Sequence, residues 1–389
     1  MRKILTAALV AAGVGMGFAA NAAEPLKIGM MVTLSGPPAV LGKHIRDGFQ
    51  LFVEQQGGKL GGRDVEIIVA DDELKPDVAL TKVKGLLERD KVDFVAGVVF
   101  SNILQAVYRP VTESGTFLIG ANAGTSTFAG KGCSPYFFST SWQNDQIHAV
   151  MGKYAQDKGF KTAFLLTPNY QAGKDSVAGF KSQFKGKVVD EVYTKLGNLD
   201  FSAELAKIAA AKPDALFTFM PGGMGINLVK QFRQAGLDKS VTFLSAFTVD
   251  GTTLPATKDD AVGLYSASQW TPDLDNAANK AFVTAFEAKY GYVPSLYASQ
   301  GYDAAQLIDS GVKAVKGDLS DKKAVQAALE KADFASVRGA FKFNTNHFPI
   351  QDFYLVKAVK RADGKYATSM VEKVFANYGD TYAAKCKMK

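Results

Sequence analysis

The sequence predicts an α/β protein with two doubly wound lobes, each built on a mainly parallel sheet that helices cover on both faces. Apolar, β-branched runs alternate with helical patterns through residues 26–120. The same alternation restarts after Trp142 and changes character near residues 269–276. Alternating strands and helices are typical of parallel sheets covered on both faces. With 389 residues, the chain is long enough for two domains of ordinary size.

The first half opens on an apolar run at residues 26–34, which predicts a buried strand. It ends in the turn signal Ser35-Gly36-Pro37-Pro38, and a helical pattern starts near Gly42. Such a turn in an open α/β sheet places a ligand loop at the carboxyl end of its strand. The expected elements that follow are a helix at 47–56, a strand at 65–70, a helix at 77–89, a strand at 92–100, a helix at 102–114 and a strand at 116–120.

The second half repeats the alternation and then changes to a mostly helical pattern. Its expected helices are 145–158, 173–184, 201–211 and 224–235, and its expected strands are 162–167, 188–193, 215–220 and 241–246. Further helices are expected at 276–290, 298–316 and 322–331, followed by strands at 351–360 and 371–375.

The N-terminus has the pattern of a cleavable export signal. Arg2 and Lys3 precede an apolar stretch, residues 4–20, and Ala20-Asn21-Ala22 offers a small-x-small cleavage site before Ala23. A membrane anchor is the alternative, but the stretch is close to the lower length limit for spanning and rich in small residues. We therefore expect residues 1–22 to be a signal peptide and the mature protein to be soluble and periplasmic.

Charge and motifs argue against several classes of function. The formal charge of +7 falls to +5 when Arg2 and Lys3 are removed, and the excess is scattered as single lysines, so nucleic acid is not an expected partner. We find no GxSxG elbow, P-loop or persuasive catalytic triad. Asp71-Asp72-Glu73 follows a strand and precedes a helix, which favours a solvated loop over an acid–base pair. Neither enzymatic activity nor a cofactor is expected.

Cys133 and Cys386 are the two cysteines of the chain. In an oxidising compartment such a pair favours one disulfide, which would tie the C-terminus to the first half; two free thiols are the alternative. The three histidines (His44, His148 and His347) are too widely spaced, from one another and from the cysteines, to indicate a metal site.

Four segments carry a resemblance to a known family: LKIGMMVTLSGPPAVLGKHIRDG, GGKLGGRDVEIIVADDELKPDVA, FVAGVVFSNILQAV and FLIGANAGTSTFA. In this order and spacing, over essentially the whole mature chain, they resemble substrate-binding proteins of the branched-chain amino-acid type of ABC transporter. The resemblance implies the type I periplasmic-binding fold, with two lobes, three hinge crossings and a ligand in the cleft between the lobes. Its implied partner is an ABC transporter permease in the inner membrane, and a monomer is expected.

Carried onto this chain, the resemblance divides it into residues 23–141 plus 273–344 for lobe I and 142–272 plus 345–389 for lobe II. The crossings then fall near residues 141–142, 271–272 and 345–346. Patterning breaks independently at the first two of these places, whereas the third rests on the resemblance alone.

In lobe I the resemblance points to residues at the carboxyl ends of strands. Ser101, beside Asn102, matches the family's carboxylate-binding serine; we expect it to cap the following helix and present its hydroxyl with free backbone N–H groups. An ordinary N-cap without a ligand is the alternative. The family's second ligand loop corresponds here to Asn122, Ala123 and Gly124, and Gly124 replaces a hydroxyl residue usual in amino-acid binders. Leu41 likewise stands where amino-acid binders often have an aromatic residue.

In lobe II, Tyr170 matches a tyrosine that commonly closes over the ligand. Phe219 and Met220 end a strand at the expected rim of the cleft, and Phe100 and Trp270 are further candidates for an apolar wall. Phe247 stands where amino-acid binders place an acidic residue for the ligand's ammonium group, with Asp250 three positions later. A buried ammonium needs such a partner.

These departures predict a ligand with a carboxylate, an apolar body and no amine, such as a benzoate-like or phenylpropanoid-like acid. One alternative is a branched-chain or other amino acid, or an amide, with Asp250 pairing the ammonium. An alternative of another class is a ligand-sensing module for a membrane receptor. In either case we expect the ligand to dock on lobe I and lobe II to close over it.

Overall fold

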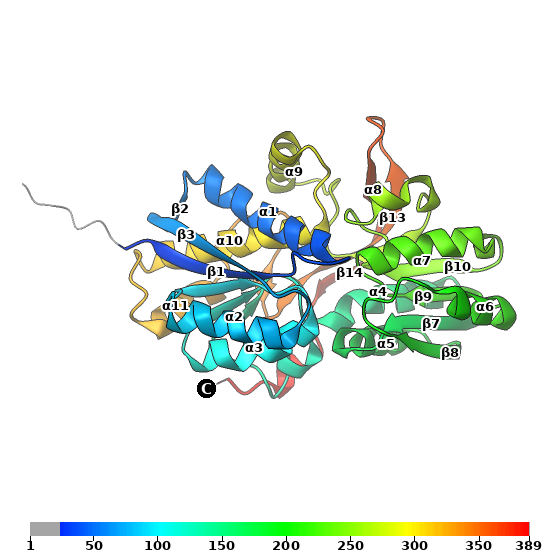
Figure 1. Ribbon diagram of the computed structural model, residues 1–389, viewed down its shortest axis with the longest axis horizontal. Helices are drawn as coiled ribbons and strands as arrows, with labels where there is room; N and C mark the ends of the chain where they lie inside the picture. The colour runs from blue at the N-terminus through cyan, green and yellow to red at the C-terminus, as the bar shows by residue number, and fades with distance from the viewer. Residues whose placement is uncertain (1–23, 389) are drawn as a thin grey trace, which may run out of the picture.

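The computed structural model describes residues 24–388, and the predicted signal peptide lies outside them. The chain folds into two α/β lobes set side by side along the long axis of the molecule (Figure 1). Each lobe is built on its own sheet of mainly parallel strands, as the sequence predicts. Among the described helices, none is both long and apolar enough to cross a membrane.

The first sheet has the strand order β2-β3-β1-β4-β5-β6. All its pairs are parallel except β2 with β3. Helices α1 and α10 pack together on one face, and α2 and α3 pack together on the other (Figure 1). The elements up to the end of this sheet are β1 (Leu26–Val32), α1 (Ala39–Gln55), β2 (Lys59–Leu60), β3 (Arg63–Asp71), α2 (Pro76–Glu88), β4 (Phe94–Gly97), α3 (Ser101–Glu113), β5 (Phe117–Gly120), η1 (Ser126–Phe128) and β6 (Phe137–Ser139).

The second sheet has the order β12-β13-β11-β10-β9-β7-β8, with β14 paired to β13. Strands β7 to β11 pair in parallel, whereas β12, β13 and β14 join by antiparallel pairs. Its elements are α4 (Asn144–Asp157), β7 (Thr162–Pro168), α5 (Gln171–Gln183), β8 (Lys187–Thr194), α6 (Ser202–Ala211), β9 (Ala215–Thr218), α7 (Gly223–Gln234), η2 (Leu237–Lys239), β10 (Thr242–Ala246), α8 (Leu254–Thr257), η3 (Lys258–Asp260), β11 (Tyr265–Ser268), β13 (Pro349–Lys360) and β14 (Tyr366–Tyr378).

The remaining helices return to the first lobe before the chain ends. They are α9 (Ala277–Tyr290), α10 (Leu296–Ala314) and α11 (Lys322–Glu330), followed by β12 (Lys342–Phe343); η4 (Ala383–Lys385) lies near the C-terminus. The chain therefore passes between the two sheets in the segments 139–144 and 268–277, whereas β12, which precedes the third predicted crossing, already pairs with β13 of the second sheet. The exact division of residues between the lobes stays a prediction.

Side chains at the helix ends explain where several of these helices begin and stop. At α4, the side chains of Gln143 and Gln146 form a reciprocal capping box. At α9, the Asn276 carboxamide accepts a hydrogen bond from the backbone N–H of Asn279, and Gly291 adopts a left-handed φ of 77° at the C-terminal end. Such caps satisfy backbone groups that a helix end would otherwise leave without partners.

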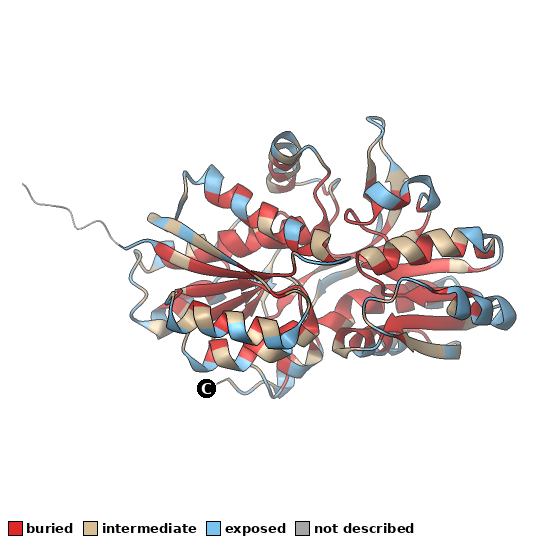
Figure 2. Ribbon diagram, viewed as in Figure 1, coloured by how far each residue is buried: buried red, intermediate tan, exposed pale blue. Residues whose placement is uncertain are grey.

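The central strands are buried on both faces (Figure 2). Every residue of β4, β5 and β9 is buried, which fits their continuous apolar sequences. Four strands were not predicted: β2, β6, β11 and β12, the last with two residues. Each has four residues or fewer, so pairing with neighbouring strands, rather than a local pattern, decides that they form.

The predicted strand 92–100 is shorter in the structure, because β4 ends at Gly97. Val98 has a left-handed φ of 63°, and its N–H donates to the Met31 carbonyl at 2.7 Å. A β-branched residue rarely adopts this conformation. The turn takes the chain out of the sheet and directs residues 99–101 toward the other lobe.

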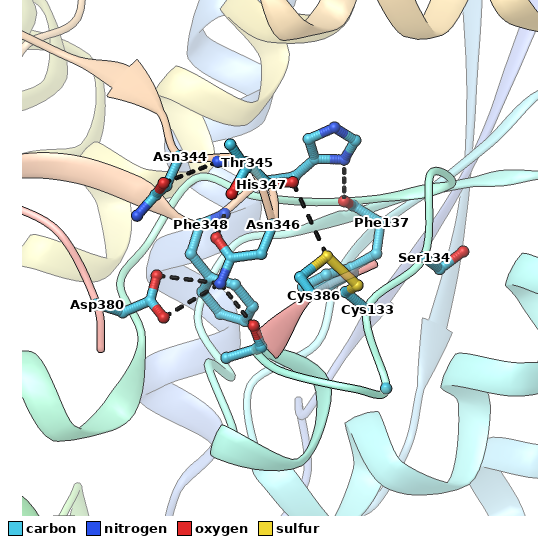
Figure 3. Close-up of a disulfide and its surroundings, with 12 residues drawn as sticks. Cys133, Ser134, Phe137, Asn344, Thr345, Asn346, His347, Phe348, Asp380 and Cys386 are labelled. Atoms are coloured by element: carbon cyan, nitrogen blue, oxygen red, sulfur yellow. Dashed lines mark hydrogen bonds between the residues drawn. A yellow bond between two sulfur atoms is a disulfide. The ribbon is translucent and has the colours of Figure 1, made fainter. Parts of the chain in front are cut away.

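The predicted disulfide between Cys133 and Cys386 is present, and it fastens the C-terminal tail to the first lobe (Figure 3). Nearby, the Asn346 carboxamide donates to both carboxylate oxygens of Asp380 at 3.0 and 3.1 Å. The His347 imidazole contacts the Phe137 carbonyl oxygen at 3.0 Å. The tail and residues 346–347, at the third predicted crossing, are thus held together beside β6.

Candidate functional site

The strand order of each sheet reverses at a point where the carboxyl ends of the strands face the other lobe. In the first sheet β3 pairs on one side of β1, and β4, which follows in the chain, pairs on the other side. In the second sheet β8 pairs on one side of β7, and β9, which follows in the chain, pairs on the other side. Open α/β sheets bind ligands at such reversal points. The loops after β1, β4, β7 and β9 therefore converge from the two lobes.

A pocket lies between these loops. It is lined from both lobes by aromatic and small apolar residues together with a few polar side chains. The lining residues are Leu41, Val99, Phe100, Ser101, Asn122, Ala123, Trp142, Asn144, His148, Tyr170, Ala172, Phe219, Pro221, Phe247 and Tyr297. An apolar pocket with a few convergent polar groups is the usual form of a small-molecule site.

Most of the residues singled out from the sequence line this pocket. Of the ten predicted site residues, the structure brings together Leu41, Ser101, Asn122, Ala123, Tyr170, Phe219 and Phe247. Phe100, a further candidate, lines it as well, and Trp270 does not.

The other three predicted site residues are absent from the pocket wall, each for a local reason. Asn102 is the second residue of α3, and its side-chain oxygen is buried without a partner among the described residues. Met220 packs in the core of the second lobe with Met224. A Cβ at Gly124 would lie 2.0 Å from the Trp142 carbonyl oxygen, so a close backbone approach requires this glycine.

Two backbone N–H groups of the 122–124 loop are also used within the protein. The N–H of Ala123 donates to the Val98 carbonyl at 3.1 Å, and the N–H of Gly124 donates to the Asn144 side chain at 3.2 Å. These two amides hold the loop in place, so they are not free to bind a carboxylate.

Ser101 occupies a different helical position from the predicted one. Phe100 is the N-cap residue of α3, with extended backbone angles, and Ser101 is the first residue of the helix. The prediction that Ser101 caps α3 is therefore wrong, and its hydroxyl makes no capping bond. Its side chain instead lies at the pocket wall beside the first backbone N–H groups of α3, which have no acceptor within the helix. A helix N-terminus of this kind favours an anion.

Asn144 orients the Ser101 hydroxyl. Its amide group donates to Ser101 Oγ at 3.2 Å and to a carboxylate oxygen of Asp175 at 2.9 Å, while its own oxygen accepts from the Gly124 N–H. A carboxylate is acceptor-only and a backbone N–H is donor-only, so the orientation of this amide is fixed. With Ser101 Oγ already accepting a hydrogen bond, its proton is free to be donated into the pocket.

Asp175 also joins the two lobes. It lies on α5 in the second lobe and accepts hydrogen bonds from the backbone N–H and the hydroxyl of Ser126 at 3.1 and 2.7 Å. Ser126 follows β5 in the first lobe. A second contact between the lobes lies where Gly222 and Gly223 face Pro37. The two lobes are therefore in direct contact at these two places.

Phe247 is the centre of the aromatic wall. Its ring centroid lies 4.6 Å from Trp142, 5.7 Å from Phe219 and 6.3 Å from Tyr297. Its φ of 57° is in the left-handed region, which is rare for a bulky residue and costs of order 1–3 kcal/mol. Strain of this size, held in place at a pocket wall, is common at ligand sites.

The side chain of Asp250 does not reach the pocket. One of its oxygens accepts from the N–H and the hydroxyl of Thr252, both at 2.6 Å, and burial raises the pKa of its carboxyl group. No aspartate or glutamate is among the pocket-lining residues in the described part of the chain. The expected counter-charge for an ammonium group is thus missing from the wall.

Sequence reasoning missed seven lining residues: the apolar Val99, Ala172 and Pro221, and the larger or polar Trp142, Asn144, His148 and Tyr297. Asn144 and His148 lie one turn apart on α4, and Tyr297 is the second residue of α10. Nothing local distinguishes these side chains from core residues. A signal would have been the polar pair at i and i+4 directly after a segment that passes between the lobes.

The comparisons with known proteins agree with this architecture. Residues 25–365 match the family model described as "Periplasmic binding protein". A curated relative, "Leu/Ile/Val-binding protein homolog 6" of Brucella melitensis biotype 1, is 27% identical over 390 residues, covering 98% of each chain.

Two solved structures are similar over almost the whole chain. One is an ABC transporter solute-binding protein from R. palustris in complex with benzoate, at 36% identity and a TM-score of 0.89, covering 94% of this chain and 100% of that one. The other is an ABC transporter solute-binding protein from Rhodopseudomonas palustris BisB5 in complex with 3,4-dihydroxybenzoic acid, at 31% identity and a TM-score of 0.86, covering 92% and 99%.

Proposed function

We propose that this chain, which belongs to the periplasmic binding protein family and is a solute-binding protein of an ABC transporter, captures an aromatic carboxylic acid between its lobes. One observation carries the proposal. The pocket combines a hydrogen-bond donor at a helix N-terminus with a wall of aromatic rings, and no acidic side chain of the described residues lines it. Such a site suits an anionic group on a flat apolar body.

The carboxylate would lie against the N-terminus of α3. There the Ser101 hydroxyl, oriented by Asn144, donates to one carboxylate oxygen, and free backbone N–H groups of α3 provide further donors. Hydrogen bonds to a charged group contribute about 1.5–3 kcal/mol each. Tyr170, which lines the pocket from the second lobe, adds its hydroxyl as a further donor.

The aromatic body of the ligand would lie between the two lobes. Phe219 and Phe247 contribute rings from the second lobe, and Leu41 closes the pocket from the first. Tyr170 and Phe219 are already stacked, with centroids 6.1 Å apart at 20°. Offset or edge-on contacts with such rings add to the burial of apolar area.

Binding then favours closure, because the ligand contacts both lobes only when they meet. The bonds between Ser126 and Asp175 form in the same closed arrangement. In this proposal the protein acts in the periplasm after removal of residues 1–22, and the closed form delivers the acid to a membrane permease.

A panel of matched ligands tests the proposal by thermal shift and calorimetry. Benzoate and benzamide share a shape but differ in charge, and 3-phenylpropanoate and phenylalanine differ by one amine. We expect benzoate and 3-phenylpropanoate to bind, and their partners to bind weakly or not at all. A ligand at about a thousand times its Kd stabilises a protein by about 4 kcal/mol, so a binder is readily detected.

A branched-chain amino acid is the second candidate, favoured by the 27% identity to the Leu/Ile/Val-binding homologue. Leucine, isoleucine and valine therefore belong in the same panel. If they alone raise the melting temperature, the aromatic-acid proposal is wrong, and an amine partner must come from outside the present pocket wall.

A further inference from the structure

His148 is a polar side chain set in the aromatic part of the pocket wall. It lies on α4 and is only 1% exposed. The rings of Phe217, Phe219 and Phe247 meet it edge-on, with centroids 5.9, 5.1 and 5.6 Å away. Its Nδ1 is buried and has no hydrogen-bond partner among the described residues.

An imidazole without a partner is out of place in such surroundings. A buried polar atom that lacks a hydrogen bond destabilises the folded protein, and an apolar ring would fill the same space without that cost. Burial lowers the pKa of His148 to about 3, so the ring is neutral at physiological pH. A neutral imidazole carries one donor and one acceptor nitrogen, which a hydroxyl group can match in either direction.

Helix α4 sets the position of His148 relative to the end of the pocket where the ligand's carboxylate would bind. Asn144, which orients Ser101, lies four residues earlier on α4. Residues at i and i+4 share a helix face and are separated by about one turn, roughly 5.4 Å. That rise is comparable with the distance across a benzene ring between its carboxyl group and a substituent on the far side. Asn144 and His148 are thus spaced along α4 as the two ends of such a ligand would be.

We propose that the ligand is an aromatic acid with a hydroxyl group on its ring, para or meta to the carboxylate, and that this hydroxyl hydrogen-bonds the imidazole of His148. The inference rests on the proposed function, which it narrows. Solved relatives are found with benzoate, with 3,4-dihydroxybenzoic acid and with 4-hydroxybenzoate, so bare and hydroxylated rings both occur among them and they do not choose between the two for this chain. The Nδ1 of His148, unpartnered among the described residues, favours the hydroxylated ring.

Four acids test the inference by calorimetry: 4-hydroxybenzoate, 3-hydroxybenzoate, benzoate and 4-methylbenzoate. The methyl and hydroxyl substituents are close in size, so the pair isolates the hydrogen bond from the filling of space. We expect at least one hydroxybenzoate to bind about tenfold or more tightly than both benzoate and 4-methylbenzoate. Equal or tighter binding of 4-methylbenzoate and benzoate would overturn the inference while leaving the proposed function intact. If none of the four binds and 3-phenylpropanoate does not bind either, the proposed function is overturned instead.

The variant His148→Phe gives an independent test. It extends the aromatic wall and removes the orphaned nitrogen, so we expect the unliganded protein to melt at the same or a higher temperature. The preference for the hydroxylated acid over benzoate should disappear in this variant. His148→Gln, which retains donor and acceptor groups, should keep part of the preference. If His148→Phe still prefers the hydroxybenzoate to the same degree, His148 is not its partner.

Discussion

Closure of the lobes can be perturbed at Gly223 without touching the ligand. Gly223 is the first residue of α7, and a Cβ built on it would lie 2.8 Å from Pro37 Cβ and 3.3 Å from the Pro37 carbonyl oxygen, in the opposite lobe. Carbon atoms in ordinary contact are about 3.5–4.0 Å apart. The rigid proline ring and the backbone of the first lobe would have to move for an alanine to fit.

The size of the effect follows from where the clash occurs. Extra atoms in a well-packed place cost about 1–3 kcal/mol. Here the cost falls on the closed form alone, because separated lobes leave residue 223 free. Since every 1.4 kcal/mol is tenfold, Gly223→Ala should weaken benzoate binding by about five- to 150-fold. Alanine is also favourable in a helix, so the unliganded protein should be as stable as before or slightly more stable.

Calorimetry with benzoate and thermal melting without ligand measure the two effects separately. Gly85→Ala is the matched control, because it also places an alanine in a helix, and its Cβ would approach only the Arg89 side chain, at 3.7 Å. The control should leave benzoate affinity unchanged. Benzoate affinity in Gly223→Ala equal to that of the unmodified protein would refute the reasoning, since the lobes would then not meet at this place in the bound state.

Three further perturbations have expected outcomes. Ser101→Ala should weaken benzoate binding about tenfold or more in calorimetry, since a hydrogen bond to a charged group is lost. The control Ser176→Ala removes a buried hydroxyl that has no partner among the described residues, and it should leave benzoate affinity unchanged. Equal effects of the two substitutions would show that Ser101 does not bind the carboxylate. Reducing the Cys133–Cys386 bond, which links residues 253 positions apart, should lower thermal stability by an amount of order 2–5 kcal/mol and spare benzoate affinity, because neither cysteine lines the pocket. Burial, together with the nearby charge of Asp175, raises the pKa of the Asp145 carboxyl group from 3.8 to about 6 in the folded protein. The contribution of Asp145 to the stability of the folded protein is therefore complete below pH 4 and is lost as the pH rises through 6. The melting temperature of Asp145→Asn, relative to that of the unmodified protein, should therefore rise between pH 4 and pH 8. A difference in melting temperature that does not change with pH would contradict this.

The sequence determined the fold class and the location of much of the pocket. Alternating strand and helix patterns predict parallel sheets, and in such sheets the segments after the strands meet at one edge. Ser101, Tyr170 and Phe247 could be found in this way, because each stands at or just after the carboxyl end of a strand in its own lobe. The disulfide was predicted from composition and compartment alone, because two cysteines permit only one pairing.

Only the tertiary structure decided which side chains face the ligand space. Asn144, His148 and Tyr297 belong to helices whose starting directions depend on how the two lobes pack, and local patterning carries no information about that. Gly124 stands in a predicted ligand loop, yet its backbone is used to hold Asn144. Met220 stands at a predicted rim, yet it packs into the core of the second lobe.

The chemistry of the pocket shows the same division. A phenylalanine at position 247 could be read from the sequence, but its left-handed backbone and its contact with Trp142 could not. The sequence alone determined that this is a two-lobed α/β protein whose candidate site lies at the carboxyl ends of its strands, because strand and helix periodicity is local. The tertiary structure alone decided which side chains of the two lobes make the wall of that site, and that one imidazole nitrogen in it has no partner among the described residues, because facing and burial depend on contacts between residues far apart in the chain.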